Sequence, residues 1–390
     1  WYLHHKTAPS AVMKRSLVGV RSLLRVQNAL KILLSAGGRR SHKAGWSYNR
    51  GSYNAGTTFS DILKMVGQFD LDLPCGTKMP VIGIGTWQTT NEEEAKTSIR
   101  SALENGYRLI DTAYCYHNEK LIGQILTDLM KSGQLKREDI FITTKLPGQY
   151  LGSRERVRKC LESSLESLGV SYVDLWLIHC PISTKENEAD SIFPLKENGE
   201  LDSEDVDLVE VWKHFEELVD EGKVKAIGLS NFNSKQIQAI HEKARHPISN
   251  LQVECHAFLA QKELFEFCKE QKITMTSFAS LGSPGRPTIM QDEKVSNLLS
   301  NELIVSMAKK YGKTPAQVLL RNLVQRGIAV IPKSVKPNRI KENIQIFDFN
   351  LTDDEMEAIS KLDCHARGFT LDFKFKGMME HPHFPFHIPF

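Results

Sequence analysis

Four side chains that can gain or lose a proton stand at or just beyond the ends of apolar runs in this sequence. An acid, Asp111, comes where the run at 107–110 should end, and a phenol, Tyr116, follows it five residues later. Lys145 and His179 close two further apolar runs. A carboxylate, a phenol, an ammonium and an imidazole can all transfer protons, so these residues are candidates for one acid–base site.

Lys145 is the most informative of the four residues. It follows a stretch of apolar and β-branched residues, so its side chain should be partly removed from water. A buried ammonium needs a partner, and Asp111 on the neighbouring strand can supply it. The alternative is a purely structural ion pair, with Tyr116 and His179 as incidental residues on the rim. Four such groups at successive strand ends favour a shared site.

Eight apolar, β-branched runs must position these groups. Most of them lack alternation, as expected of parallel strands that are buried on both faces. A short alternating pair around residues 74–77 predicts a β-hairpin ahead of them. The eight runs cover residues 81–87, 107–113, 140–146, 173–179, 224–231, 251–256, 274–280 and 329–334.

Helical patterns fill the gaps between the runs. Thr90 and Glu93 predict a capping box that opens a helix at 91–104. Apolar residues recur at helical spacing over 208–219, and Gly222 should end that helix. Further helices are expected at 154–168, 234–245, 261–271, 302–311, 315–326 and 336–346.

The alternation of strands and helices predicts an α/β fold, a (β/α)8 TIM barrel with an N-terminal β-hairpin and a long C-terminal loop. A doubly wound sheet is the alternative, but it would show a Gly-rich phosphate loop after its first strand. Gly83 and Gly85 lie inside the first strand, and a third glycine is missing. In a barrel, the long segments 180–207 and 281–325 and the tail after 363 should form the substrate walls.

The composition is that of a globular protein. Of 390 residues, 41% are hydrophobic and 25% are charged, and no apolar run is long enough to span a membrane. The first 60 positions hold ten basic residues and no acid, which leaves 40 basic and 47 acidic residues in the remainder despite a net charge of +3. A mildly acidic body argues against a nucleic-acid partner.

The seven cysteines are dispersed, without the spacing of a zinc site. This usage favours reduced thiols, a cytoplasmic location and no bound metal. No repeat or coiled-coil pattern indicates assembly, so we expect a monomer.

Residues 1–64 form a basic extension that differs from the barrel expected over 65–390. The segment is rich in Arg, Ser and Gly, begins with Trp, and has no acid before Asp61. Such segments resemble mitochondrial presequences, although basic and apolar residues are only loosely segregated here. We expect a disordered extension or a segment that is not native, with Met65 as the true start. Mitochondrial targeting is the alternative if the extension is real.

With these motifs in their order, residues 65–390 resemble the aldo-keto reductase family. The resemblance rests on Gly-Thr-Trp at 85–87, Ile-Asp-Thr-Ala to Asn-Glu at 110–119, and Lys145. It continues in three later motifs, which are Asp-Leu-Trp-Leu-Ile-His at 174–179, Gly-Leu-Ser-Asn-Phe at 228–232, and Ile-Pro-Lys-Ser to Glu-Asn at 331–343.

The resemblance implies reduction of aldehydes or ketones to alcohols, with the catalytic tetrad Asp111, Tyr116, Lys145 and His179. Tyr116 would donate the proton, and Lys145, held by Asp111, would lower the pKa of the phenol. His179 would orient the carbonyl oxygen. Some relatives that reduce a steroid double bond carry Glu at this position, so the histidine favours carbonyl reduction.

The resemblance also implies NADPH as the cofactor. Ser230, Asn231 and Gln252 would hold the carboxamide, and Phe278 would stack on the nicotinamide where relatives often carry Tyr. Lys333, Ser334, Arg339 and Asn343 match the site of the 2′-phosphate. The alternative, a solvated basic turn, would explain Lys336 as easily as Lys333, but not the full Ile-Pro-Lys-Ser context. The remaining cofactor contacts are expected from Gly85, Thr86, Trp87, Leu281, Val335 and Glu342.

Trp87, Tyr116, His179 and Cys180 are expected to contact a small carbonyl substrate. The aldose reductase branch has Trp where this chain has Cys180 and Pro147, which predicts a less aromatic pocket. Cys115 and Cys180 flank the tetrad and would make the enzyme sensitive to oxidation. Aldose sugars, lipid aldehydes, steroids and prostaglandins all remain candidate substrates.

Two other functions are compatible with a barrel. A non-catalytic barrel could bind a nucleotide to regulate a partner protein, but its tetrad should be degraded. A hydrolase would need paired carboxylates at the ends of strands 4 to 7, where Glu254 stands without a clear partner.

Overall fold

The computed structural model of the protein describes residues 70–390, apart from 188, 287–297, 372–375 and 389. These residues fall in the second of two units of the chain, Phe59–Phe390. The predicted extension at 1–64 and the proposed start at Met65 lie outside the described residues. Within the described part, no helix has the length and apolar character needed to cross a membrane.

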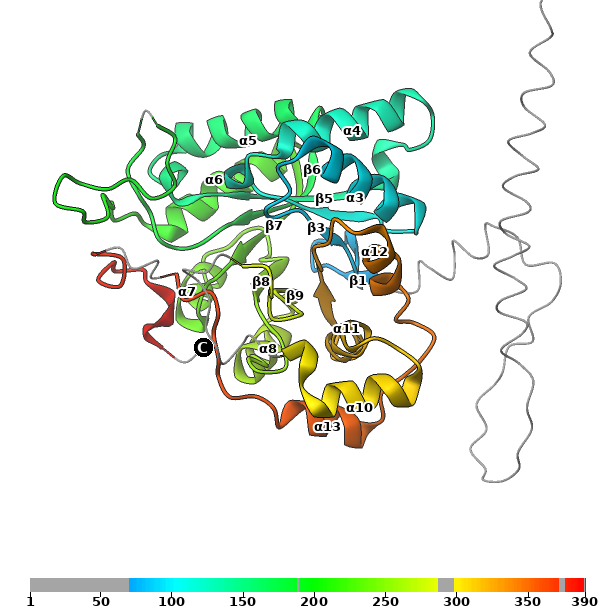
Figure 1. Ribbon diagram of the computed structural model, residues 1–390. Coiled ribbons are helices and arrows are strands. Elements are labelled where there is room, and N and C mark those ends of the chain that lie inside the picture. The colour runs from blue at the N-terminus through cyan, green and yellow to red at the C-terminus, as the bar shows by residue number, and fades with distance from the viewer. Residues whose placement is uncertain (1–69, 188, 287–297, 372–375, 389) are drawn as a thin grey trace, which may run out of the picture. The chain divides into compact units, whose positions relative to one another are not determined.

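Eight parallel strands form the centre of the fold and confirm the predicted barrel (Figure 1). Each strand pairs with the next one along the chain. Hydrogen bonds between the segment around Ile82 and Val330 join the first strand to the last, with Gly83 N 2.9 Å from Val330 O. The strands are β3 (Ile84–Gly85), β4 (Leu109–Asp111), β5 (Phe141–Leu146), β6 (Val173–Ile178), β7 (Val224–Ser230), β8 (Asn250–Glu254), β9 (Thr274–Phe278) and β10 (Ile328–Val330).

The predicted hairpin is also present, as the antiparallel strands β1 (Asp70–Asp72) and β2 (Lys78–Pro80). Its turn contains Gly76 at φ +89°, a conformation that favours glycine. Leu73 and Met79 of the hairpin are buried in one cluster with inward-facing strand residues such as Leu109. The hairpin therefore closes the barrel at the N-terminal ends of the strands.

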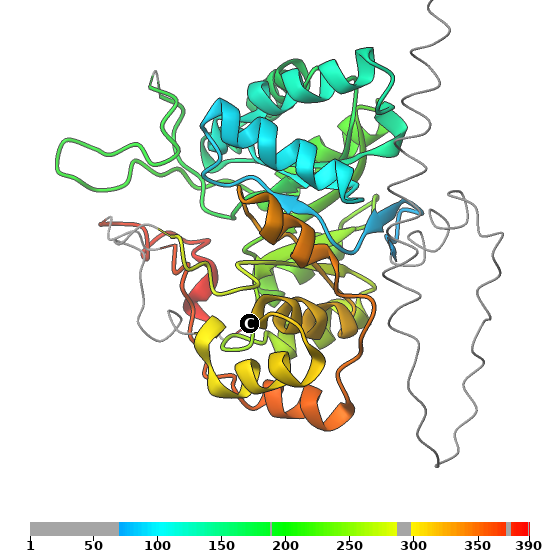
Figure 2. The same cartoon turned by 45° about the vertical axis from the view of Figure 1, so that its right-hand side comes forward.

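Helices surround the strands, as Figures 1 and 2 show. Their apolar faces pack against the outward-facing strand residues, for example where the Trp176 and Phe215 rings stack with centroids 4.0 Å apart. The helices are α3 (Glu92–Glu104), α4 (Glu119–Lys131), α5 (Arg154–Leu168), α6 (Leu208–Asp220), α7 (Ser234–His241), α8 (Lys262–Glu270), α10 (Glu302–Tyr311), α11 (Pro315–Gln325), α12 (Pro337–Ile344) and α13 (Asp353–Ser360).

Three details of the helices correct the sequence analysis. The N-cap of α3 is Asn91, whose side chain accepts the N–H of Glu94, so the capping box predicted from Thr90 and Glu93 is wrong. Helix α4 begins at Glu119, the last residue of the motif at 110–119, and was not predicted. Helix α13 was also missed, although Thr352 opens it with a capping box.

The long connections lie at the C-terminal ends of the strands. The connection after β6 pairs with the C-terminal tail through a bridge between Glu200 and Lys376, and Leu201 N lies 2.8 Å from Lys376 O. The tail then runs beside α7 (Figure 1). Two segments that are remote in sequence therefore meet above the barrel.

Candidate active site

The four predicted acid–base groups meet at one end of the barrel. Asp111 is the last residue of β4, Lys145 lies in β5, and His179 directly follows β6. Tyr116 lies on the short 3₁₀ helix η2 (Tyr114–Tyr116) that leaves β4. Because β4, β5 and β6 are parallel neighbours, their C-terminal ends bring these side chains together.

Lys145 is fully buried, and its ammonium group makes two hydrogen bonds. Its Nζ donates to Asp111 Oδ1 at 2.7 Å and to the carbonyl oxygen of Thr112 at 2.8 Å. The second carboxylate oxygen of Asp111 accepts a bond from Gln252 Nε2 at 2.8 Å. The predicted partnership of Lys145 and Asp111 is therefore present, and both charges are compensated inside the barrel.

The loop that carries Tyr116 is tied to the first strand. Asn118 is buried, and its Nδ2 donates to the carbonyl oxygens of Thr86 at 2.8 Å and Thr89 at 3.2 Å. Its Oδ1 accepts from the Thr112 hydroxyl at 2.8 Å. These bonds hold the turn in place and set the direction in which Tyr116 points.

Tyr116 lies between the ammonium and the imidazole. Lys145 Nζ is 5.2 Å from the centroid of its ring, and the His179 ring lies edge-on at 5.7 Å. Burial raises the pKa of Tyr116 well above its usual value, and the negative charge of Asp111 raises it further. Burial and the charge of Asp111 dominate in this state, so the expectation that Lys145 lowers this pKa stays a prediction. The phenol therefore holds its proton at neutral pH, which is the state that a proton donor requires.

His179 is neutral. Burial, reinforced by the charge of Lys145, lowers the pKa of its imidazole to about 3. Its Nδ1 lies 3.4 Å from the thiol of Cys115, and burial raises the pKa of that thiol to about 12. A protonated thiol can donate to Nδ1, so we infer that the ring proton sits on Nε2.

Cys115 and Cys180 are also the residues for which the sequence predicts oxidation sensitivity. Burial raises the pKa of the Cys180 thiol to about 11 and that of the Cys115 thiol to about 12. The thiolate is the form that reacts with oxidants, and little of it exists at neutral pH for either residue. These pKa shifts argue against the expected sensitivity.

A cavity of about 990 Å³ opens at this end of the barrel. Of the predicted site residues, Lys145 alone does not line it, since it lies behind the wall. The wall includes Asp111, Tyr116, His179 and Cys180. It also includes the predicted cofactor contacts Gly85, Thr86, Trp87, Ser230, Asn231, Gln252, Phe278, Leu281, Lys333, Ser334, Val335, Arg339, Glu342 and Asn343.

The side-chain amides of Asn231 and Gln252, which are expected near a nicotinamide, donate hydrogen bonds to residues of the tetrad. Asn231, at φ +62°, donates from Nδ2 to the carbonyl oxygen of His179 at 2.9 Å and to Ser230 Oγ at 3.1 Å. Gln252 uses its Nε2 for Asp111. The carbonyl oxygens of the Asn231 and Gln252 side chains therefore remain to accept hydrogen bonds from a ligand.

Exposed cations stand at the far end of the cavity. Lys333, Lys336 and Arg339 line it around the N-terminus of α12. No carboxylate of the described residues lies within ion-pair distance of them. Lys336, which was not among the predicted cofactor contacts, also lines the cavity. This end of the cavity is suited to a phosphate.

The three segments predicted as substrate walls each contribute residues to the lining of the cavity. Ile182 and Phe193 come from the connection after β6, Pro284 from the connection after β9, and Phe369 and Leu371 from the tail. All three predicted segments therefore contribute. No local pattern marks these residues, because they become neighbours only through the arrangement of the loops.

The C-terminal tail contributes an aromatic ring to the pocket. Phe369 packs edge-to-face against Trp87, with centroids 5.5 Å apart, and against Phe278 at 5.4 Å. The tail thus supplies an aromatic ring in a pocket that has Cys180 and Pro147 where the aldose reductase branch has Trp.

Comparison with known proteins agrees with the geometry. The model of the Aldo/keto reductase family matches residues 81–363. Aldo-keto reductase family 1 member A1-A of Danio rerio is 41% identical over 328 residues, which cover 82% of this chain and 99% of that protein. Prostaglandin F synthase 1 of Bos taurus is 41% identical over 319 residues, covering 80% and 95%.

A solved structure gives the same result. The aldose reductase of Schistosoma japonicum superposes with a TM-score of 0.74 and 42% sequence identity, and the match covers 82% of this chain and 99% of that one. The eight-stranded barrel, the acid–base groups at its mouth and these matches lead to one conclusion: the chain belongs to the aldo/keto reductase family of oxidoreductases.

Proposed function

We propose that the protein reduces aldehydes and ketones to alcohols, with NADPH as the hydride donor and Tyr116 as the proton donor. One observation carries the proposal. A protonated phenol, a buried Lys145–Asp111 ion pair and a neutral imidazole surround one end of a cavity that is large enough for a dinucleotide and a small substrate.

The residues present fit NADPH. Lys333, Lys336 and Arg339 offer positive charge to a 2′-phosphate, and Asn231 and Gln252 offer side-chain oxygens to a carboxamide. Phe278 offers a ring face at the end of β9. When bound, NADPH supplies the hydride.

The residues of the chain then handle the charge that develops on the carbonyl oxygen. His179 Nε2–H donates a hydrogen bond to this oxygen and orients the carbonyl group. Tyr116 Oη gives its proton to the same oxygen as negative charge builds up. The phenolate that remains is stabilised by Lys145, whose charge and position Asp111 maintains. The aromatic side chains Trp87 and Phe369 exclude water from the substrate.

The decisive experiment follows the absorbance of NADPH with an aromatic aldehyde, glyceraldehyde and a quinone. Tyr116→Phe removes only the hydroxyl and should lower kcat by about 10²- to 10⁴-fold. Tyr114→Phe is the matched control, because Tyr114 Oη bonds Tyr150 and Asp190 outside the tetrad, and it should retain activity within a few-fold. An undiminished rate in Tyr116→Phe, or no NADPH oxidation by the native protein, contradicts the proposal. The second result would favour the non-catalytic nucleotide-binding barrel.

A further inference from the structure

Glu254 is a buried carboxylate that the proposed reaction does not use. It ends β8 two residues beyond Gln252, and its side chain is fully buried. It is absent from the wall of the large cavity. An ionised carboxylate in such a position must be compensated by hydrogen bonds or by opposite charge.

The C-terminal tail provides that compensation. The backbone N–H of Gly368 lies 2.8 Å from Oε1 and 3.0 Å from Oε2 of Glu254, and the N–H of Phe369 lies 2.9 Å from Oε2. His256 Nε2 approaches Oε1 at 3.1 Å. Two consecutive amides of the tail thus point at one carboxylate that comes more than a hundred residues earlier in the chain.

Gly368 allows this close approach. A Cβ at this position would lie 2.8 Å from Arg286 Nη1 and 3.0 Å from Glu254 Oε1. Any side chain here would therefore push the tail away from the carboxylate, or displace the groups around it. The backbone of the tail therefore contacts the carboxylate of Glu254 directly.

Phe369, whose backbone N–H bonds Glu254, forms part of the cavity wall. Phe369 lines the cavity and packs edge-to-face against Trp87 and Phe278, at 5.5 Å and 5.4 Å between centroids. Trp87 follows β3 and Phe278 ends β9, so Phe369 spans the mouth of the barrel between them. The amide that bonds Glu254 and the ring that faces the cavity belong to the same residue.

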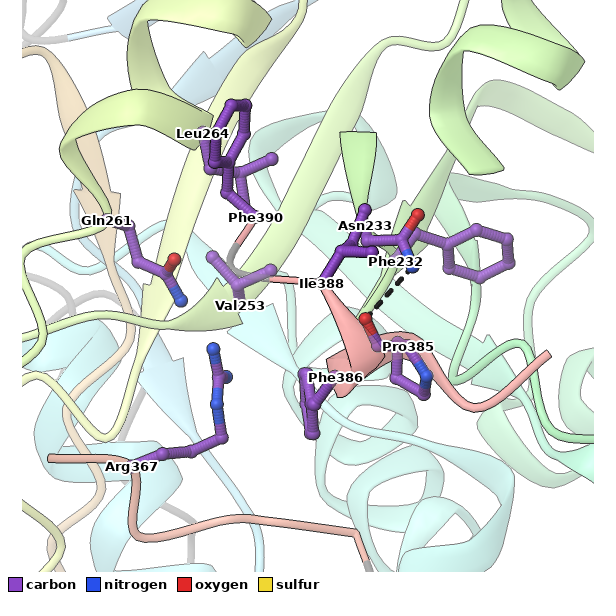
Figure 3. Close-up of a pocket in the computed structure, with 10 residues that line it drawn as sticks. All are labelled: Phe232, Asn233, Val253, Gln261, Leu264, Arg367, Pro385, Phe386, Ile388 and Phe390. Atoms are coloured by element: carbon purple, nitrogen blue, oxygen red, sulfur yellow. Dashed lines mark hydrogen bonds between the residues drawn. The ribbon is translucent and has the colours of Figure 1, made fainter. Parts of the chain in front are cut away.

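A second attachment holds the end of the tail on α7 (Figure 3). Asn233 Nδ2 donates to the carbonyl oxygen of Pro385 at 2.9 Å, and Gln236 Nε2 donates to that of His383 at 2.9 Å. The Arg367 guanidinium lies 3.9 Å from the centroid of the Phe386 ring. The pocket between these residues measures only about 10 Å³, which is room for about one water molecule, so this attachment is closely packed.

We propose that Glu254 is a positioning residue that fixes the tail so that Phe369 forms a rigid apolar wall for the substrate. The protein would thereby favour carbonyl compounds with a large aromatic or apolar group over small polar ones. This inference rests on the proposed carbonyl reduction, and it names the feature that selects among substrates. Glu254 acts through Phe369 and takes no part in the chemical step.

The test compares Glu254→Gln with the native enzyme on two substrates. The amide keeps the size of the side chain but presents an NH₂ group to the tail amides. The KM of a bulky aromatic aldehyde should rise about tenfold, the size of one lost aromatic contact. The KM and kcat of glyceraldehyde should stay within a few-fold. Glu119→Gln is the matched control, because Glu119 is also buried at this end of the barrel but bonds Thr144 and Ser164.

A double variant separates positioning from general damage. Phe369→Ala should produce the same loss for the bulky aldehyde, and adding Glu254→Gln to it should cause no further change. An additional loss in the double variant, or an equal rise of KM for both substrates in Glu254→Gln, overturns the proposal. If Glu254→Gln does not fold, Gly368→Ala takes its place and should give the same selective rise, and its absence there also overturns the proposal.

One readout does not depend on catalysis. Hydrogen exchange at the amides of Gly368 and Phe369 should be faster in Glu254→Gln than in the native protein, while the strand amides of β8 stay protected. If the native protein reduces no carbonyl compound, the proposed function fails, and this measurement alone still decides whether Glu254 holds the tail. Unchanged exchange at both amides means that it does not.

Discussion

The thiol of Cys115 lies 3.4 Å from Nδ1 of His179, so the residue next to the proposed proton donor contacts the residue that we propose orients the substrate. Because burial keeps the thiol protonated and the imidazole neutral, the thiol can act as the donor and Nδ1 as the acceptor. This arrangement places the remaining ring proton on Nε2, where a carbonyl oxygen can accept it.

Cys115→Val should therefore impair catalysis without affecting the cofactor. Losing one modest hydrogen bond should lower kcat/KM by about 3- to 10-fold, and the Kd of NADPH should not change. Cys115→Ser keeps a donor and should stay closer to the native rate. Nitrogen-15 NMR of the imidazole reports the tautomer directly, and an unaltered tautomer in Cys115→Val would show that the thiol has no such role.

The neutral state of His179 predicts how stability depends on pH. Its pKa is lowered from 6.5 to about 3 in the folded protein, so the unfolded chain binds the extra proton throughout that interval. Stability should fall as the pH drops below 6.5, by up to about 1.4 kcal/mol per pH unit from this residue. His179→Gln cannot take up the proton. Its melting temperature should decline less than that of the native protein between pH 7 and pH 5, and parallel declines would refute the assignment.

The Lys145–Asp111 pair predicts a large effect on folding. Asp111→Asn leaves the buried ammonium without its counter-charge and should lower the free energy of unfolding by about 3–5 kcal/mol. Glu92→Gln, which breaks an exposed ion pair with Lys96, is the control and should leave the free energy of unfolding nearly unchanged. Urea denaturation measures both. A cost for Asp111→Asn as small as that of the control would show that Lys145 is compensated in another way.

The cations at the far end of the cavity predict the choice of cofactor. Lys333→Ala removes one charge-assisted contact and should raise the Kd of NADPH by about 10- to 100-fold, while NADH binding changes little. Lys341→Ala is the matched control, since Lys341 lies on α12, shortly after Lys333 in the chain, and does not line the cavity. Fluorescence titration with both nucleotides checks this prediction. Equal weakening of NADPH and NADH by Lys333→Ala would mean that the phosphate site is misplaced.

Several parts of the fold could be predicted because their signals are local. Runs such as 140–146 and 173–178 are mostly apolar and become fully buried strands, since parallel strands in a barrel are covered on both faces. The signals of two missed helices were also present. Ile122, Ile125, Leu126 and Leu129 recur at helical spacing and form a buried face on α4, and Thr352 opens α13 with a capping box.

The candidate tetrad was predictable for the same reason. Each of its residues lies near or just beyond the end of a recognisable strand. Parallel strands that are neighbours bring their C-terminal ends together, so the order of the strands in the sequence places Asp111 next to Lys145. What the sequence could not provide was the balance of charge around Tyr116. The pKa of the phenol depends on burial and on the distances to Asp111 and Lys145, which only the folded barrel determines.

The sequence by itself predicted the barrel, the four acid–base groups and, through the family resemblance, the residues proposed to hold a nicotinamide nucleotide. The tertiary structure decided what surrounds them: the thiol against His179, the tail against Glu254, and Phe369 against Trp87. The physical reason is the range of the interactions. Strand and helix patterns arise between residues a few positions apart, whereas these contacts join segments separated by 64 to 282 positions and leave no periodic trace in the sequence.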